Sequence, residues 1–214
     1  MRPLIFAFAA LVALCAGAAA QEAAPPPADN QAAPAPAAPV NPPPANPVMT
    51  GPKILISTSM GDITVQLDEV RAPKSVANIL RYVREKHYDG TAVYRVVKGF
   101  VIQMGSWDAN VKARPVHAPV AFEGGNGLSN LRGTVALAHG DEPNSAVAEF
   151  FINLADNSGL DHSDSQAGFA VFGQVLSGME VADAIAEVPV GDHGPMPGQA
   201  PVTPIVIKKI SILP

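Results

Sequence analysis

Hydrophobic and polar positions alternate with a period of two in several short runs of this chain, and turn-forming residues separate the runs. Alternation of this kind, with many β-branched and aromatic residues, is typical of β-strands that have one buried face. The turns Met60-Gly61-Asp62 and Lys98-Gly99 each join two runs and predict hairpins. The predicted strands are residues 54–58, 63–67, 93–97, 100–105, 133–138, 149–154, 169–175 and 205–212.

Two other segments have the 3.6-residue period of an amphipathic helix. The first begins at Pro73, and its apolar positions are Val76, Ile79, Leu80 and Val83. The second covers about residues 179–186, and its apolar face is made by Val181, Ala182 and Ile185. Many short strands with only two helices predict a mainly β protein, and a closed barrel would leave no strand edge exposed.

One predicted strand carries an unusual arginine. Strict alternation places Arg95 on one face together with Val93 and Val97. Tyr94 and Val96 fall on the opposite face. A structural interpretation is that the aliphatic stem of the arginine covers apolar surface while its guanidinium reaches water. The alternative is a functional site, because an aromatic residue and an amide follow closely in a segment that otherwise has the composition of a sheet core.

Residues 1–20 have the pattern of a secretory signal peptide. Arg2 precedes a short apolar run, and small residues stand directly before Gln21. The apolar run is too short to span a bilayer comfortably. Cys15 raises the alternative of a lipid anchor, which Leu14 disfavours because bacterial lipoproteins carry a small residue at that position. We therefore expect an exported, periplasmic protein without stable insertion in the membrane.

The next segment, residues 21–52, consists almost entirely of Ala, Pro, Asn and Gln. Proline lacks an amide donor, and this composition offers nothing from which a core could be built. We expect a disordered linker with polyproline II character. The folded domain is expected to cover residues 53–214.

Composition removes several classes of function. The chain has 214 residues and a formal net charge of −5, which fits one domain with a tail and gives no basic surface for nucleic acid. Its single cysteine, Cys15, lies in the predicted signal peptide, so a thiol nucleophile, a redox thiol and a disulfide are not expected in the mature protein. Nothing in the sequence requires more than a monomer.

Five segments along the predicted strands carry a further signal, and they are residues 94–96, 99–103, 133–138, 148–153 and 168–173. In their order and spacing they resemble the cyclophilin-type peptidyl-prolyl isomerases. The resemblance begins near Lys53, extends to the C-terminus, and is closest to the short periplasmic members from bacteria. It implies a closed eight-stranded antiparallel β-barrel capped by two α-helices, with a packed interior and a substrate site on the outer surface.

The resemblance implies an enzyme that isomerises X-Pro bonds in unfolded or folding proteins. Rotation breaks amide resonance and has a barrier of roughly 20 kcal/mol, but no covalent bond forms or breaks. No nucleophile, metal or cofactor is therefore expected. A fixed hydrogen-bond donor stabilises the twisted amide more than the planar one. Carried over from the family, Arg95 is that donor, and Gln103 orients the guanidinium and binds the substrate backbone.

The resemblance also assigns the residues that contact the substrate. Ala138 and His139 would offer backbone groups to the residues that precede proline. Without the resemblance, the apolar members of the site would be taken for ordinary barrel core. The proline pocket would be lined by Phe100, Val101, Phe151, Leu160 and Phe169.

Several positions depart from the family pattern. Glu149 stands where many members have glutamine, and we expect its carboxylate to pair with Arg95, where it would either orient the guanidinium or compete with substrate. Gly159 stands where the cyclosporin-sensitive members have tryptophan, which predicts weak binding of cyclosporin. His139 replaces the usual asparagine at a position whose contacts are largely main-chain.

Two other functions compete with isomerisation. The first is a chaperone or binding module that recognises proline-containing segments with little turnover. The second is a hydrolase that uses Ser163, His162 and either Asp161 or Asp164, although catalytic triads come from separated segments and need an oxyanion hole. A metal site that uses Asp161 and His162 is also disfavoured, because no third ligand stands at a suitable spacing in the sequence.

Overall fold

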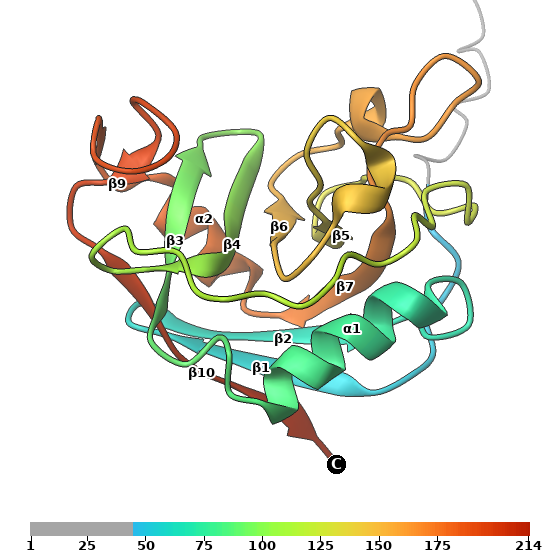
Figure 1. Ribbon diagram of the computed structural model, residues 1–214, viewed down its shortest axis with the longest axis horizontal. Coiled ribbons are helices and arrows are strands. Elements are labelled where there is room, and N and C mark those ends of the chain that lie inside the picture. Colours follow the sequence, from blue (N-terminus) through green and yellow to red (C-terminus); the bar gives the residue numbers. More distant parts are fainter. Residues whose placement is uncertain (1–44) are drawn as a thin grey trace, which may run out of the picture. The chain divides into compact units, whose positions relative to one another are not determined.

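The computed structural model describes residues 45–214, which form a closed antiparallel barrel (Figure 1). The strand order around the barrel is β1-β10-β3-β4-β6-β5-β7-β2, so the predicted eight-stranded barrel is confirmed. The predicted signal peptide and most of the predicted linker lie outside the described residues. The strands are β1 Lys53–Thr58, β2 Gly61–Leu67, β3 Thr91–Val97, β4 Val101–Asp108, β5 Thr134–Leu137, β6 Phe150–Asn153, β7 Val171–Ser177 and β10 Ile205–Leu213.

The two predicted helices are present as α1 (Pro73–Arg84) and α2 (Met179–Ala186). Proline suits the first turn of α1, where its missing amide hydrogen would have no acceptor within the helix. The helix α1 contacts β10, and α2 contacts β2, β3 and β4. The buried residues that the helices add to the barrel core include Val76, Ile79, Leu80, Val83, Ala182 and Ile185. No described helix has the length and apolar character needed to cross a membrane.

The sequence did not predict four smaller elements. Two are single turns of 3-10 helix, and two are short strands that pair with each other outside the barrel. They are η1 Pro143–Ser145, η2 Ser158–Leu160, β8 Val190–Gly191 and β9 Ala200–Pro201.

A β-bulge in β3 changes the pattern of faces that strict alternation predicts. Val93 pairs with Met104 and Arg95 pairs with Gln103, so β3 has one residue more than β4 in this stretch. The additional residue is Tyr94. A bulge of this kind shifts the alternation of side chains between the two faces of a sheet.

The assignment of faces in this strand was therefore wrong. Val93 and Val96 both belong to the barrel core, although strict alternation placed them on opposite faces. Tyr94 and Arg95 both lie on the outer side, where Tyr94 contacts Glu149 and Arg95 lines a surface pocket. The bulge thus brings two polar side chains to the same face.

Two glycines shape the strand that follows. Gly99 has φ of 70° in the predicted turn between β3 and β4, and the amide of Phe100 closes this turn by donating to the carbonyl of Val97 at 3.0 Å. Gly105 has φ of 146°, and a Cβ atom there would lie 2.6 Å from the carbonyl oxygen of Ala148. The missing side chain lets the backbone of β4 approach the segment that carries Glu149.

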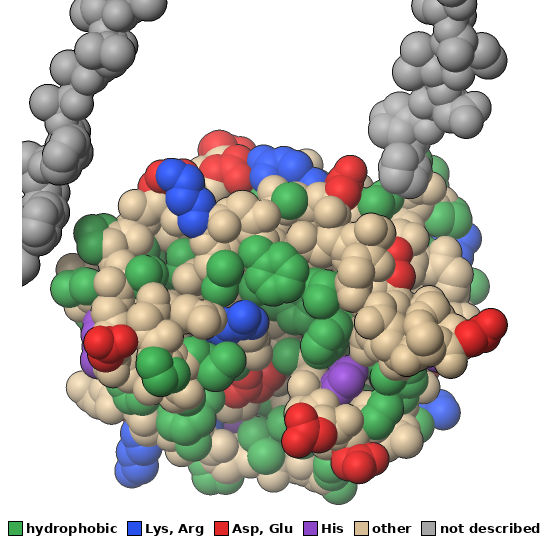
Figure 2. All heavy atoms as spheres, turned by 90° about the horizontal axis from the view of Figure 1, so that it is seen from above, with side chains coloured by type: hydrophobic (Ala, Val, Ile, Leu, Met, Phe, Trp, Pro, Cys, Tyr) green, Lys and Arg blue, Asp and Glu red, His purple; other side chains and the backbone are tan. Residues whose placement is uncertain are grey.

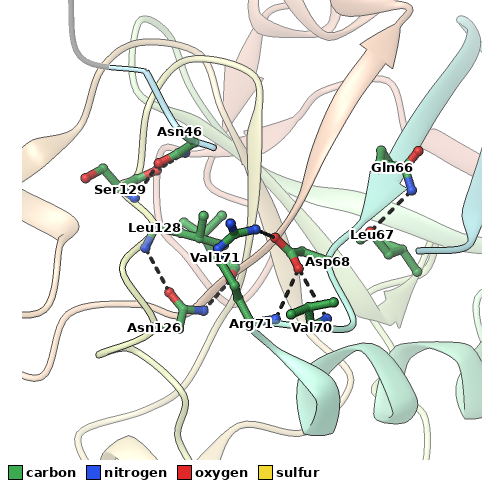
Figure 3. A network of polar contacts seen from close by, with 10 residues as sticks. All are labelled: Asn46, Gln66, Leu67, Asp68, Val70, Arg71, Asn126, Leu128, Ser129 and Val171. Carbon is green, nitrogen blue, oxygen red and sulfur yellow. Dashed lines mark hydrogen bonds and ion pairs between the residues drawn. The ribbon is translucent and has the colours of Figure 1, made fainter. Parts of the chain in front are cut away.

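The last part of the expected linker contacts the barrel. The side chain of Asn46 donates to the carbonyl of Ser129 at 2.8 Å and accepts from its amide at 2.8 Å (Figure 3). Met49 is 6% exposed and packs with apolar residues on the outer side of the barrel. Residues 45–52 are thus attached to the folded domain, because one amide and one apolar side chain find partners there.

Candidate active site

A second apolar cluster lies on the outer side of the barrel, separate from the core. Its buried members come from several strands and from two loops. Phe100, Leu160 and Phe169 are partly buried and pack against them. The buried members are Met49, Val101, Leu128, Ala136, Ala138, Phe151 and Val171.

A cavity of about 280 Å³ opens over this cluster. All the site residues predicted from the sequence line this cavity, with the exception of Glu149. Met196 lines the cavity as well. Figure 2 shows hydrophobic side chains gathered around a hollow together with basic and acidic ones. The lining residues are Arg95, Phe100, Val101, Gln103, Ala138, His139, Phe151, Leu160, Phe169 and Met196.

Aromatic packing and a buried amide fix the apolar wall of this cavity. The rings of Phe151 and Phe169 meet edge to face with centroids 5.4 Å apart, and His139 stacks on Phe169 at 4.6 Å. The side chain of Asn130 donates to the carbonyls of Leu160 and Phe169 at 3.1 and 3.2 Å. These contacts fix the wall residues of the cavity relative to one another.

Arg95 is the cation of the cavity, and two amide oxygens hold its guanidinium. Nη1 donates to Oε1 of Gln103 at 3.0 Å, and Nε donates to Oε1 of Gln199 at 2.6 Å. Among the described residues, no protein atom accepts a hydrogen bond from Nη2. Neutral partners thus hold the guanidinium at two of its nitrogens, while the remaining donors are available to a ligand.

Gln103 also belongs to a second group of hydrogen bonds. The hydroxyl of Tyr94 donates to Oε2 of Glu149 and accepts from the side-chain amide of Gln103. The same amide donates to Oε2 of Glu149 at 3.2 Å. Burial raises the pKa of Glu149, although the bonds from Tyr94 and Gln103 oppose this shift. Burial also raises the pKa of Tyr94, and the neighbouring carboxylate adds to the effect.

The predicted ion pair between Glu149 and Arg95 is not present. The partners of the carboxylate are Tyr94 and Gln103, and Gln103 stands between the two charges. Glu149 lines an adjacent cavity of about 220 Å³. This second cavity shares Gln103, Ala138 and His139 with the first one, so the two form neighbouring parts of one surface groove.

The alternative site at residues 161–163 does not assemble as a catalytic triad. The carboxylate of Asp161 accepts from the amide of Asn130 at 2.6 Å, and the ring of His162 contacts the carbonyl of Ala167 at 2.9 Å. The hydroxyl of Ser163 is 3.1 Å from that of Ser165. These residues thus have structural partners, and no cluster suited to a metal ion occurs in the part of the chain that the structure describes.

The sequence did not single out Tyr94, Met196 or Gln199 as members of the site. Tyr94 lies on the outer face because of the bulge in β3, and the alternation of residue types does not reveal a bulge. Met196 and Gln199 come from the loop between β8 and β9, far along the chain from Arg95. A loop rich in glycine and proline carries no periodic signal, so only the folded chain shows that it reaches the cavity.

Comparisons with known proteins agree with this geometry. Residues 53–212 match the sequence profile of the cyclophilin type peptidyl-prolyl cis-trans isomerases. The chain is 44% identical over 170 residues to peptidyl-prolyl cis-trans isomerase A of Dickeya dadantii, covering 79% of this chain and 89% of the relative. It is 37% identical over 162 residues to peptidyl-prolyl cis-trans isomerase B of Escherichia coli, covering 74% of this chain and 98% of the relative.

A solved structure shares the fold at lower identity. The cyclophilin-type isomerase of Cryptosporidium parvum, crystallised in the presence of the dipeptide Ala-Pro, superimposes with a TM-score of 0.63 at 23% identity. The match covers 76% of this chain and 99% of that structure.

Proposed function

The chain belongs to the cyclophilin-type peptidyl-prolyl cis-trans isomerases, and from this premise we propose that it isomerises X-Pro bonds in exported proteins as they fold, with Arg95 as the catalytic donor. The observation that carries the proposal is the position of Arg95. Its guanidinium is held by two amide oxygens beside an aromatic-walled cavity of about 280 Å³. A proline ring is an apolar group that a cavity of this kind accommodates.

The proposed mechanism uses no covalent chemistry. The apolar wall formed by Phe100, Phe151 and Leu160 holds the proline ring while the peptide bond rotates. In the twisted state the amide loses resonance, and its nitrogen becomes a better hydrogen-bond acceptor. A donor of Arg95 that has no protein partner stabilises this state more than the planar one, which lowers the barrier.

The residues that precede proline would lie along Ala138 and His139. The amide of Ala138 already donates to the carbonyl of Glu149 at 2.8 Å, so this amide is not available to a substrate. The carbonyl of Ala138 and the backbone of His139 remain for that role. Gln103 holds Arg95 and lines both cavities, which places it beside the substrate backbone.

The cellular context of the proposal rests on the N-terminal sequence. Residues 1–20 have the charge and hydrophobicity pattern of a secretory signal, and residues 21–52 have the composition of a linker. We propose that the domain acts in the periplasm on proline-containing segments of unfolded or folding proteins. A monomer suffices for this activity, because every residue proposed for the site comes from one chain.

The test is the cis-to-trans rate of a short Ala-Pro peptide with the wild-type protein and with Arg95→Ala. Loss of a preorganised donor is expected to lower kcat/KM by about 10²- to 10³-fold. The exposed Arg84→Ala on α1 is the matched control and should leave the rate unchanged. If wild type bound the peptide without accelerating its isomerisation, the protein would be a proline-binding chaperone instead.

A further inference from the structure

The loop between β8 and β9 ends at Gln199, which lies directly beside the strand of Arg95. The carbonyl of Gln199 accepts from the amide of Val96 at 2.7 Å, and its own amide donates to the carbonyl of Met196 at 3.2 Å. The first bond fixes the backbone of this residue against β3, and the second closes a tight turn. The side chain of Gln199 is therefore attached at a defined position next to Arg95.

The side chain of Gln199 completes the support of the guanidinium. Its Oε1 atom accepts from Nε of Arg95 at 2.6 Å, while Gln103 accepts from Nη1 on the other side at 3.0 Å. Two points of attachment fix both the position and the rotation of a planar group, whereas a single bond would leave it free to turn. A hydrogen bond to a charged group also contributes more than one between neutral groups.

Both supports of Arg95 are neutral amides. A carboxylate in either position would form an ion pair with the guanidinium and compete with the substrate for its donors. An amide oxygen accepts a hydrogen bond without adding a negative charge, so the positive charge stays available to the twisted peptide bond. The carboxylate of Glu149, which belongs to the site, is bonded to Tyr94 and Gln103 instead.

We propose that Gln199 is a positioning residue, which orients Arg95 for catalysis from the loop between β8 and β9. This inference rests on the proposed role of Arg95. Met196, in the same loop, lines the proline cavity, so one loop fixes the donor and supplies part of the pocket wall. The loop thus belongs to the catalytic site although the sequence offers no motif there.

The kinetic test combines Gln199→Leu with Arg95→Ala. In the wild-type background, Gln199→Leu is expected to lower kcat by about tenfold, because the guanidinium is no longer fixed, with a smaller change in KM. In the Arg95→Ala background the same substitution should change the rate by less than about twofold, because a positioning residue has nothing left to orient. An equal loss in both backgrounds would show a merely structural role and overturn the proposal.

Two further variants separate position from charge. Gln199→Glu keeps an acceptor for Nε but adds a negative charge, and it is expected to lower kcat/KM although Arg95 stays in place. Val202→Ala, at an exposed position just beyond β9, is the matched control and should behave as wild type. If Gln199→Glu were as active as wild type, the neutral character of the support would have no importance and that part of the proposal would fail.

A spectroscopic measurement tests the contact without relying on turnover. In ¹H–¹⁵N spectra of the full chain at mildly acidic pH, the Nε–H signal of Arg95 should exchange slowly with water in the wild type. In Gln199→Leu it should shift and exchange faster, while the backbone spectrum stays that of the folded protein. An unchanged Nε–H signal would sink the proposal. An inactive wild type that kept this contact would instead refute the proposed function and, with it, the catalytic role of Gln199.

Discussion

The side-chain oxygen of Gln103 accepts a hydrogen bond from Nη1 of Arg95 at 3.0 Å. On its other side, the amide nitrogen of Gln103 donates to the carboxylate of Glu149 at 3.2 Å. One amide thus satisfies a cation and an anion at once and keeps them from pairing directly. The guanidinium retains donors for the substrate, and the half-buried carboxylate retains the hydrogen bonds that its burial requires.

Gln103→Leu removes both of these bonds and keeps a side chain of similar volume. We expect kcat/KM to fall by about tenfold or more, because Arg95 loses one support and the substrate loses a partner. We also expect the free energy of unfolding to fall by about 1–3 kcal/mol, since Glu149 loses a donor in a half-buried place. Peptide isomerisation and urea unfolding on the same samples check both effects. Full activity in this variant would contradict the role given to Gln103.

Glu149→Gln is expected to leave turnover within about twofold of wild type. The carboxylate does not pair with Arg95, so its removal frees no donor of the guanidinium. A glutamine in this place can still accept from Tyr94 and Gln103 through its oxygen. The measurement is kcat/KM with an Ala-Pro peptide. A severalfold rise would mean that the carboxylate competes with substrate for Arg95 after all.

The same substitution should change how stability depends on pH. Burial raises the pKa of Glu149 in the folded protein above its value in the unfolded chain. The folded state therefore favours the protonated carboxyl, and this stabilisation is complete below about pH 4.3 and is lost as the pH rises through the folded pKa. Glu149→Gln should thus gain stability relative to wild type as the pH rises from 4 to 7 (a range chosen around the reference value).

Chemical unfolding of both proteins at several pH values checks this prediction. Val202→Ala is the control, because this exposed side chain carries no titratable group and its difference from wild type should change little with pH. If the difference for Glu149→Gln were constant across the range, the burial of this carboxylate would have no energetic consequence.

Most of the barrel could be predicted because its strands and helices have strong local signals. The apolar positions in α1 and the alternation of burial along β1 and β2 reflect burial on one side only. The bulge at Tyr94 has no such signal, because it arises from how β3 pairs with β4. The predicted faces of that strand were wrong for this reason.

The candidate site was predictable only as far as its motifs extend. The family resemblance located Arg95, Gln103 and the aromatic wall, and the cavity brings these residues together. It did not reveal the partner of Glu149, because an ion pair is the simplest expectation for two opposite charges near each other. Gln199 was missed, since its role comes from a long-range contact of a loop without periodicity.

Gly159 offers a prediction about inhibitor binding. A Cβ atom at this position would meet no other atom within 4 Å, so a larger side chain has room there beside the wall residue Leu160. We expect weak binding of cyclosporin to the wild type and tighter binding to Gly159→Trp, by about tenfold, through the added aromatic surface. Titration with cyclosporin while isomerisation is followed gives both constants. Submicromolar inhibition of the wild type would contradict this expectation.

Met49 provides the last prediction, which concerns the segment before β1. Its side chain is 6% exposed and packs in the same apolar cluster as Val101 and Phe151, which line the proline cavity on its inner side. Met49→Ala would leave a gap under the pocket, and we expect a loss of unfolding free energy of about 2–3 kcal/mol. The wall of the cavity would also become less rigid, which should raise KM for the peptide.

The neighbouring Val48 is 85% exposed and provides the matched control, because Val48→Ala removes apolar atoms that contact water already. Its free energy of unfolding should stay within about 0.5 kcal/mol of wild type. Equal stability of Met49→Ala and Val48→Ala would show that residues 45–52 belong to the linker alone. A loss confined to Met49→Ala would instead extend the functional domain upstream of β1, to the point where Asn46 is bound by Ser129.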